Sequence, residues 1–180
     1  TAGPGFLILT LQIIRRVTSY KVTDKALMML RNIVQVSMII NVFLLFCELF
    51  KEFYTDSAHV ASAKYLFFGL HGHHGLVPWI WTAMALDAAA LLLLVLPLSR
   101  SLKYLDIACV LAIVGIWIEK GMGLVVPAFI PTPLGEIVVY FPTLNEWLIC
   151  GGIWAFGLLL YTLFLKMTLP VLTGDLRPRP

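Results

Sequence analysis

Residues 72–98, GHHGLVPWIWTAMALDAAALLLLVLPL, have the length and apolar content of a membrane span, yet they carry Asp87 near their middle. A carboxylate at the centre of a spanning helix costs about 2.5–3.5 kcal/mol of insertion free energy. Such a residue normally faces a bundle interior and has a partner or a function. Three of the chain's four histidines, His71, His73 and His74, lie at the start of this stretch. The functional question is what these polar groups do.

The composition places the whole chain in a membrane. Of its 180 residues, 60% are hydrophobic and 13% are charged, and its mean hydropathy is +0.92. A soluble domain of this length cannot bury so much apolar surface. The sequence also contains no nucleophile motif, phosphate-binding loop or nucleotide fingerprint, which argues against ordinary soluble-type catalysis. The three cysteines stand singly, without a C-x-x-C pair, so we expect no iron–sulfur cluster or structural zinc in the chain itself.

The apolar runs predict an all-α integral membrane protein: a transmembrane four-helix bundle over residues 26–168, plus one partial span. Residues 1–19 read as the end of a preceding transmembrane helix, because the run is short for a span and starts without Met. We therefore expect the C-terminal portion of a longer protein. Residues 169–180 are predicted to form a polar tail. The four predicted spans cover about 32–53, 76–98, 104–126 and 144–166.

The basic residues predict the orientation. One set of loops, together with the tail, holds 10 of the 13 lysines and arginines. The positive-inside rule makes this side cytoplasmic, with the C-terminus on it, and directs the histidine cluster outward. The ten residues are Arg15, Arg16, Lys21, Lys25, Arg31, Arg100, Lys103, Lys166, Arg177 and Arg179.

The span at 32–53 carries a polar stripe. Ser37, Asn41 and Glu48 fall on one face, because offsets of four and seven return to the same side of a helix. Interhelical hydrogen bonding alone would explain Ser37 and Asn41. For Glu48, a structural and a functional role both stay open.

Two further spans carry charged residues at other depths. Glu119 and Lys120 lie about one turn past the middle of the 104–126 run. Neighbours in sequence point in different directions on a helix, so we expect separate partners for them. Snorkelling to the interface would explain Lys120. If Asp87, Glu48, Glu119 and Asn41 converge, they form a chain of protonatable and polar groups of the kind that proton relays use, with Lys120 as a further candidate for the proton pathway.

The position of the histidines disfavours haem ligation and leaves several other roles open. A bis-histidine haem needs ligands from facing helices within the spans, whereas His71, His73 and His74 lie at the outer side, so a haem-b cytochrome is disfavoured. H-x-H-H without a carboxylate at fixed spacing is a weak metal signal. An interfacial cluster ordered by its loop, proton handling and quinone contact stay open, since histidine titrates near neutral pH. Trp79 is expected to be an interface anchor.

Four motifs resemble the polysulfide-reductase membrane-subunit family, often called the NrfD family. They are E-L-F at 48–50, H-x-x-x-P-W at 74–79, W-I-E-K-G-M at 117–122 followed by P-x-P-L-G-E-x-x-x-Y-x-P-T at 131–143, and P-V-L-T-G-D-L-R at 170–177. The last is similar to the family's larger branch, found in sulfate-reducer complexes and in hydrogenase partners. The resemblance covers nearly all of the chain, and the 117–143 block is its most specific part.

The resemblance implies a subunit of the prokaryotic cytoplasmic membrane, built as two four-helix bundles without a cofactor of its own. Such subunits exchange electrons between menaquinone or menaquinol and an iron–sulfur partner subunit. Larger assemblies add multihaem cytochromes c and other membrane subunits, and no nucleic acid is involved. This chain would supply the end of the first bundle, the second bundle and the tail.

The resemblance also implies where the sites lie. The family's quinone pocket belongs mainly to the first bundle, and buried acids of the second bundle form a proton path. Asp87, Glu119 and Glu48 would fill that role here. A structural membrane anchor and an ion or proton transporter remain the alternatives. A transporter predicts inverted repeats and broken helices, and neither is visible in the sequence.

Overall fold

The computed structural model describes residues 1–18, 20–55, 60–130, 136–137 and 142–173. Within them the chain is all-α, as predicted, and has no β-strand. The long helices are α1 (Ala2–Val17), α2 (Asp24–Thr55), α4 (Val77–Val95), α5 (Leu102–Lys120) and α6 (Leu144–Thr173). The short elements are α3 (Val60–Phe67), the 3₁₀ turns η1 (Pro97–Arg100) and η3 (Pro127–Phe129), and the π-helix η2 (Gly121–Val125).

Four helical segments are long and apolar enough to cross a membrane, and each contains most of one predicted span. α1, with 16 residues, is shorter than a span, as its short apolar run predicts. The chain forms two compact units, Thr1–Val139 and Tyr140–Pro180. Most of the P-x-P-L-G-E block, including residues 131–135 and Tyr140, lies outside the described residues.

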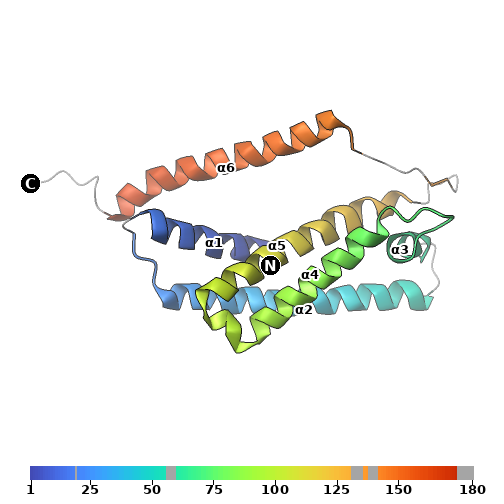
Figure 1. The fold of residues 1–180 in the computed structure, drawn as a ribbon, viewed down its shortest axis with the longest axis horizontal. Coiled ribbons are helices and arrows are strands. Elements are labelled where there is room, and N and C mark those ends of the chain that lie inside the picture. The colour runs from blue at the N-terminus through green and yellow to red at the C-terminus, as the bar shows by residue number, and fades with distance from the viewer. Residues whose placement is uncertain (19, 56–59, 131–135, 138–141, 174–180) are drawn as a thin grey trace, which may run out of the picture. The chain divides into compact units, whose positions relative to one another are not determined.

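The first unit is built around the antiparallel pair α4 and α5, which pack along their lengths, with α1 against α5 and α2 (Figure 1). Small residues let the helices approach closely. Such small residues are part of the apolar core between the helices. The buried side chains of this core are Ile8, Val22, Leu27, Val34, Met38, Ala90, Leu94, Leu105, Ala108, Cys109 and Ala112.

The two ends of this unit differ in charge. The C-terminus of α1, the N-termini of α2 and α5, and η1 meet at one end, which we call the basic end (Figure 1). It carries Arg15, Arg16, Lys21, Lys25, Arg31, Arg100 and Lys103. α3 lies at the opposite end, beyond the C-terminus of α2.

The histidine segment is a turn that precedes α4. Gly69, His71 and Gly72 have positive φ angles of 83°, 49° and 86°, and Leu70 and His73 exchange two backbone hydrogen bonds. α4 starts only at Val77, with a proline in its first turn. His73 therefore does not share a helical face with Asp87, because the turn ends before the helix begins.

The second unit contains α6. A capping box starts the helix: the backbone N–H of Thr143 donates to Glu146 Oε2 over 2.6 Å, and the N–H of Glu146 donates to Thr143 Oγ1 over 3.4 Å. No described side chain of α6 is buried. The helix continues through Pro170 to Thr173, so residues 169–173, predicted to belong to the tail, are helical.

Candidate functional site: a polar cluster among three helices

Polar side chains from three helices meet inside the first unit. Asn41 comes from α2, Asp87 from α4, and Glu119 and Lys120 from the end of α5; we call these four residues the polar cluster. Asn41 Nδ2 donates a hydrogen bond to Glu119 Oε2 over 3.2 Å. Lys120 Nζ donates to the other oxygen, Glu119 Oε1, over 2.6 Å. Of the five candidate residues, the structure thus brings Asn41, Asp87, Glu119 and Lys120 together.

Glu119 and Lys120 form an ion pair, so the expectation of wholly separate partners is wrong. The helix directs the two Cβ atoms apart, but the lysine stem is long enough to return its ammonium group to the neighbouring carboxylate. The Glu119 side chain is 3% exposed, whereas that of Lys120 is 45% exposed. The pair thus joins the buried part of the cluster to an accessible surface.

Asp87 is the least satisfied member of the cluster. The residue is 3% exposed, and neither of its carboxylate oxygens has a hydrogen-bond partner among the described residues. It interacts electrostatically with Glu119 and Lys120. Gly115 on α5 makes room for it, because a Cβ at Gly115 would lie 2.9 Å from Asp87 Cγ. A carboxylate held this way needs a bound proton or a cation, since a buried charge without a partner is costly.

A cavity of about 190 Å³ lies beside the cluster, on the side of α3. Glu48, Glu119 and Lys120 all line it. The polar face predicted on α2 is therefore split between two places: Asn41 joins the cluster by its hydrogen bond, whereas Glu48 is exposed and lines the cavity beside it. We call this space the Glu48 cavity. Its remaining lining residues are Leu45, Leu49, Glu52, Ser62, Ala63, Leu66, Phe67, Ile80, Gly123, Leu124, Pro127 and Ala128.

The histidines lie elsewhere. His71, His73 and His74 are exposed, and His74 Nδ1 lies 3.0 Å from the carbonyl oxygen of Phe68. None of them lines the Glu48 cavity. Among the described residues, no three His, Cys, Asp or Glu side chains gather so that they could hold a metal ion. Trp79 is exposed as well, so the predicted quinone or interface candidates form no site with the polar cluster.

A second groove near the histidine turn is apolar and aromatic. Trp81 Nε1 donates to the carbonyl oxygen of Phe67 over 3.2 Å, and the two rings meet edge to face with centroids 6.1 Å apart. The groove is lined by Phe46, Leu49, Phe50, Phe53, Phe67, Phe68, Trp81 and Met84. Such a surface suits lipid chains, and it offers little for chemistry.

Sequence reasoning missed the polar contacts of the basic end. Arg31 donates to Ser99 Oγ from Nε over 2.9 Å and from Nη2 over 2.7 Å, and to the carbonyl oxygen of Leu94 over 2.6 Å. These contacts tie α2 to the turn between α4 and α5. The sequence offers an arginine near the start of a span and a serine in a short turn, and nothing in it pairs the two.

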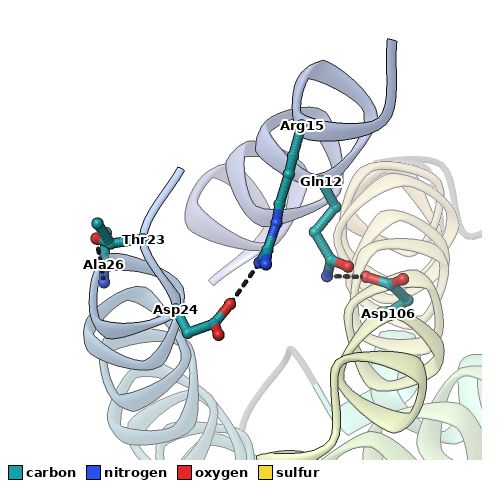
Figure 2. A network of polar contacts seen from close by, with 6 residues as sticks. All are labelled: Gln12, Arg15, Thr23, Asp24, Ala26 and Asp106. Carbon is teal, nitrogen blue, oxygen red and sulfur yellow. Dashed lines mark hydrogen bonds and ion pairs between the residues drawn. The ribbon is translucent and has the colours of Figure 1, made fainter. Parts of the chain in front are cut away.

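Asp106 joins α1 to α5 at the same end. Gln12 Nε2 donates to Asp106 Oδ1, and nearby Arg15 pairs with Asp24 (Figure 2). Arg16 Nη2 lies 3.8 Å from Asp106 Oδ2. In the sequence, the glutamine inside the apolar run of α1 indicates that this side chain needs a polar partner.

Comparisons with models of protein families, with curated proteins and with solved structures gave no match to this chain. The functional argument therefore starts from the chemistry of the polar cluster. Two carboxyl groups, an amide and an ammonium group can hold, orient and transfer a proton.

Proposed function

We propose that this chain is part of a membrane subunit of a quinone-linked respiratory oxidoreductase complex. The subunit exchanges electrons between menaquinone or menaquinol and an iron–sulfur partner subunit. The observation that supports this proposal is the polar cluster, in which the acids of two helices converge with Asn41 and Lys120 beside a cavity. The membrane is the prokaryotic cytoplasmic membrane, with the basic end and the C-terminus on the cytoplasmic side.

Quinone chemistry explains the need for such a cluster. Oxidation of a quinol releases two electrons and two protons, and reduction of a quinone takes up the same number. In the proposal the electrons pass to or from clusters or haems of partner subunits, including multihaem cytochrome c in larger assemblies. Asp87 and Glu119 accept or deliver protons. Lys120 balances the charge of Glu119, and Asn41 orients its carboxylate by the 3.2 Å hydrogen bond.

The test uses the natively purified assembly in mild detergent. A reduced menaquinone analogue is added without oxygen, and the visible spectrum of the co-purifying haem or iron–sulfur centres is recorded. We expect the centres to become reduced and a quinone-site inhibitor to prevent this. Absence of redox centres, or centres that exchange electrons with the quinone pool in neither direction, would overturn the proposal.

Two variants separate this function from that of a structural anchor. We expect Asp87→Asn and Glu119→Gln to slow quinol turnover by about 10²-fold or more while the complex still assembles, because proton transfer by a positioned side chain contributes about that much. Asp24→Asn is the matched control, since Asp24 is an exposed carboxylate paired with Arg15 at the basic end. Unchanged turnover in both cluster variants would favour an anchor.

A further inference from the structure

The polar cluster carries an unbalanced charge when its acids are ionised. Asp87 and Glu119 contribute two negative charges and Lys120 one positive charge, so one positive charge is missing. Lys120 is hydrogen-bonded to Glu119, whereas both oxygens of Asp87 are buried without a hydrogen-bond partner among the described residues. One bound proton removes the imbalance. Among the described residues no third His, Cys, Asp or Glu side chain joins these two carboxyl groups to hold a metal ion, so we assign the missing charge to a proton.

The side of the cluster facing α3 offers water a route. The Glu48 cavity, about 190 Å³, is large enough to hold several waters. Its charged lining residues are Glu48 and Glu52 from α2, and Glu119 and Lys120 from α5. α3 contributes Ser62, whose hydroxyl group donates to the carbonyl oxygen of Ile130. These polar groups give water the partners that it needs inside a protein.

The side of the cluster that faces the basic end is packed with apolar side chains. Between the cluster and the basic end, α2 contributes Val34 and Met38 to the apolar core, and α4 contributes Ala90 and Leu94. α5 contributes a run of small and apolar side chains, which includes Cys109. Each of these residues is fully buried. The charged side chains of α1, Arg15 and Arg16, pair with Asp24 and Asp106 at the basic end.

We propose that Asp87 and Glu119 together hold one exchangeable proton, which reaches water only at the α3 end of the unit, through the Glu48 cavity. The proposal adds a proton count and a sidedness to the proposed function. Its tests use no quinone, so its failure can be told apart from the failure of that function. Lys120 lies on this route between the cavity and the cluster, because it lines the cavity and contacts Glu119.

Infrared spectroscopy of the purified complex tests the shared proton. We expect a protonated-carboxyl band that shifts in D₂O and is lost in both Asp87→Asn and Glu119→Gln. Without Asp87, Glu119 remains ionised beside Lys120; without Glu119, Lys120 is free to pair with Asp87. Asp24→Asn is the control and should keep the band. A band that survives in either cluster variant, or its absence in the unmodified protein, would overturn the shared proton.

Thiol labelling in right-side-out and inverted vesicles tests the sidedness. Cys47 and Cys150 are replaced by alanine, and the native Cys109 is kept as the reporter of the apolar core. For the cavity reporter, Cys109 is also replaced and Leu45→Cys is introduced, because Leu45 lines the Glu48 cavity. Lys21→Cys in the same cysteine-free background marks the basic end, where Lys21 is exposed.

A small membrane-impermeant methanethiosulfonate should label the Leu45→Cys variant about tenfold or more faster from one side, opposite to the side that labels the Lys21→Cys variant. Cys109 should stay unlabelled from both sides. Equal labelling of the Leu45→Cys variant from both sides, labelling from the basic end, no labelling, or reaction of Cys109 would overturn the one-sided route. If the Leu45→Cys protein does not assemble, Ala63→Cys on α3 serves as the cavity reporter.

Discussion

The amide group of Asn41 on α2 donates a hydrogen bond to the carboxylate of Glu119 on α5, although the two residues stand 78 positions apart in the chain. Through this contact the longest helix of the first unit reaches the polar cluster. Lys120 binds the other oxygen of the same carboxylate. Glu119 is therefore held from two sides, whereas Asp87 beside it is held by no hydrogen bond among the described residues.

Replacing Asn41 by leucine should loosen α2 from α5. Interhelical hydrogen bonds in membranes contribute about 0.6 kcal/mol on average and up to about 2 kcal/mol, so we expect the Asn41→Leu variant to lose about 1 kcal/mol of unfolding free energy. Unfolding in mild detergent measures the loss. Ile40→Leu, at the exposed neighbouring position, is the control. Equal stability of the two variants would show that the hydrogen bond contributes nothing measurable.

A methyl group at Gly115 should force α4 and α5 apart. The added Cβ would lie 2.9 Å from Asp87 Cγ and 3.2 Å from Leu86 Cβ, and overpacking of this kind typically costs about 1–3 kcal/mol. Gly3→Ala is the control, because its Cβ would meet no atom within 4 Å. Asp87→Ala should recover much of the stability lost by Gly115→Ala. Additive effects of these two changes would contradict the close contact.

Ser99 is expected to contribute more to the stability of the fold than its small side chain suggests. It is fully buried, accepts two hydrogen bonds from Arg31, and donates to the carbonyl oxygen of Leu94 over 3.1 Å. Hydrogen bonds to charged groups are worth about 1.5–3 kcal/mol, so Ser99→Ala should lower the unfolding free energy by about that amount. Ser101→Ala is the matched control: Ser101 is exposed and makes no capping hydrogen bond with its side chain. Similar stabilities of the two variants would argue against this role.

Double-mutant cycles should rank the two contacts of Figure 2 differently. Gln12 is buried where it meets Asp106, so their coupling energy should reach about 0.5–3 kcal/mol. Arg15 and Asp24 have side chains 41% and 67% exposed, so that pair should contribute at most about 1 kcal/mol. Added salt should weaken only the exposed pair. Equal coupling energies with equal salt dependence would contradict this ranking.

The sequence predicts the spans well and their mutual contacts poorly. Runs of about 20 apolar residues have few alternatives to a spanning helix, so the spans predicted at 76–98 and 104–126 correspond to α4 and α5, with different ends. Periodicity placed Asn41 on the polar face of its helix. It could not show that this face meets Glu119, because a nearly all-apolar helix gives little sign of which side faces a neighbour.

The remaining differences have local causes. The positive φ angles of Gly69, His71 and Gly72 build a turn, so the histidines precede α4 and do not belong to the helix. The flexible stem of Lys120 allows an ion pair that backbone geometry alone disfavours. Ser99 looked like an ordinary turn residue, because the sequence does not show that Arg31 lies beside it.

Asp87 also bears on how the protein is made. α4 leaves the ribosome before α5, so its carboxylate would enter the bilayer without Glu119 and Lys120 if the helix were inserted alone, at a cost of about 2.5–3.5 kcal/mol. Only residues 96–101 separate the two helices. This short connection lets α4 and α5 enter as a hairpin, with the aspartate already facing its neighbours. Lengthening the turn would then impair biosynthesis before it altered the finished protein.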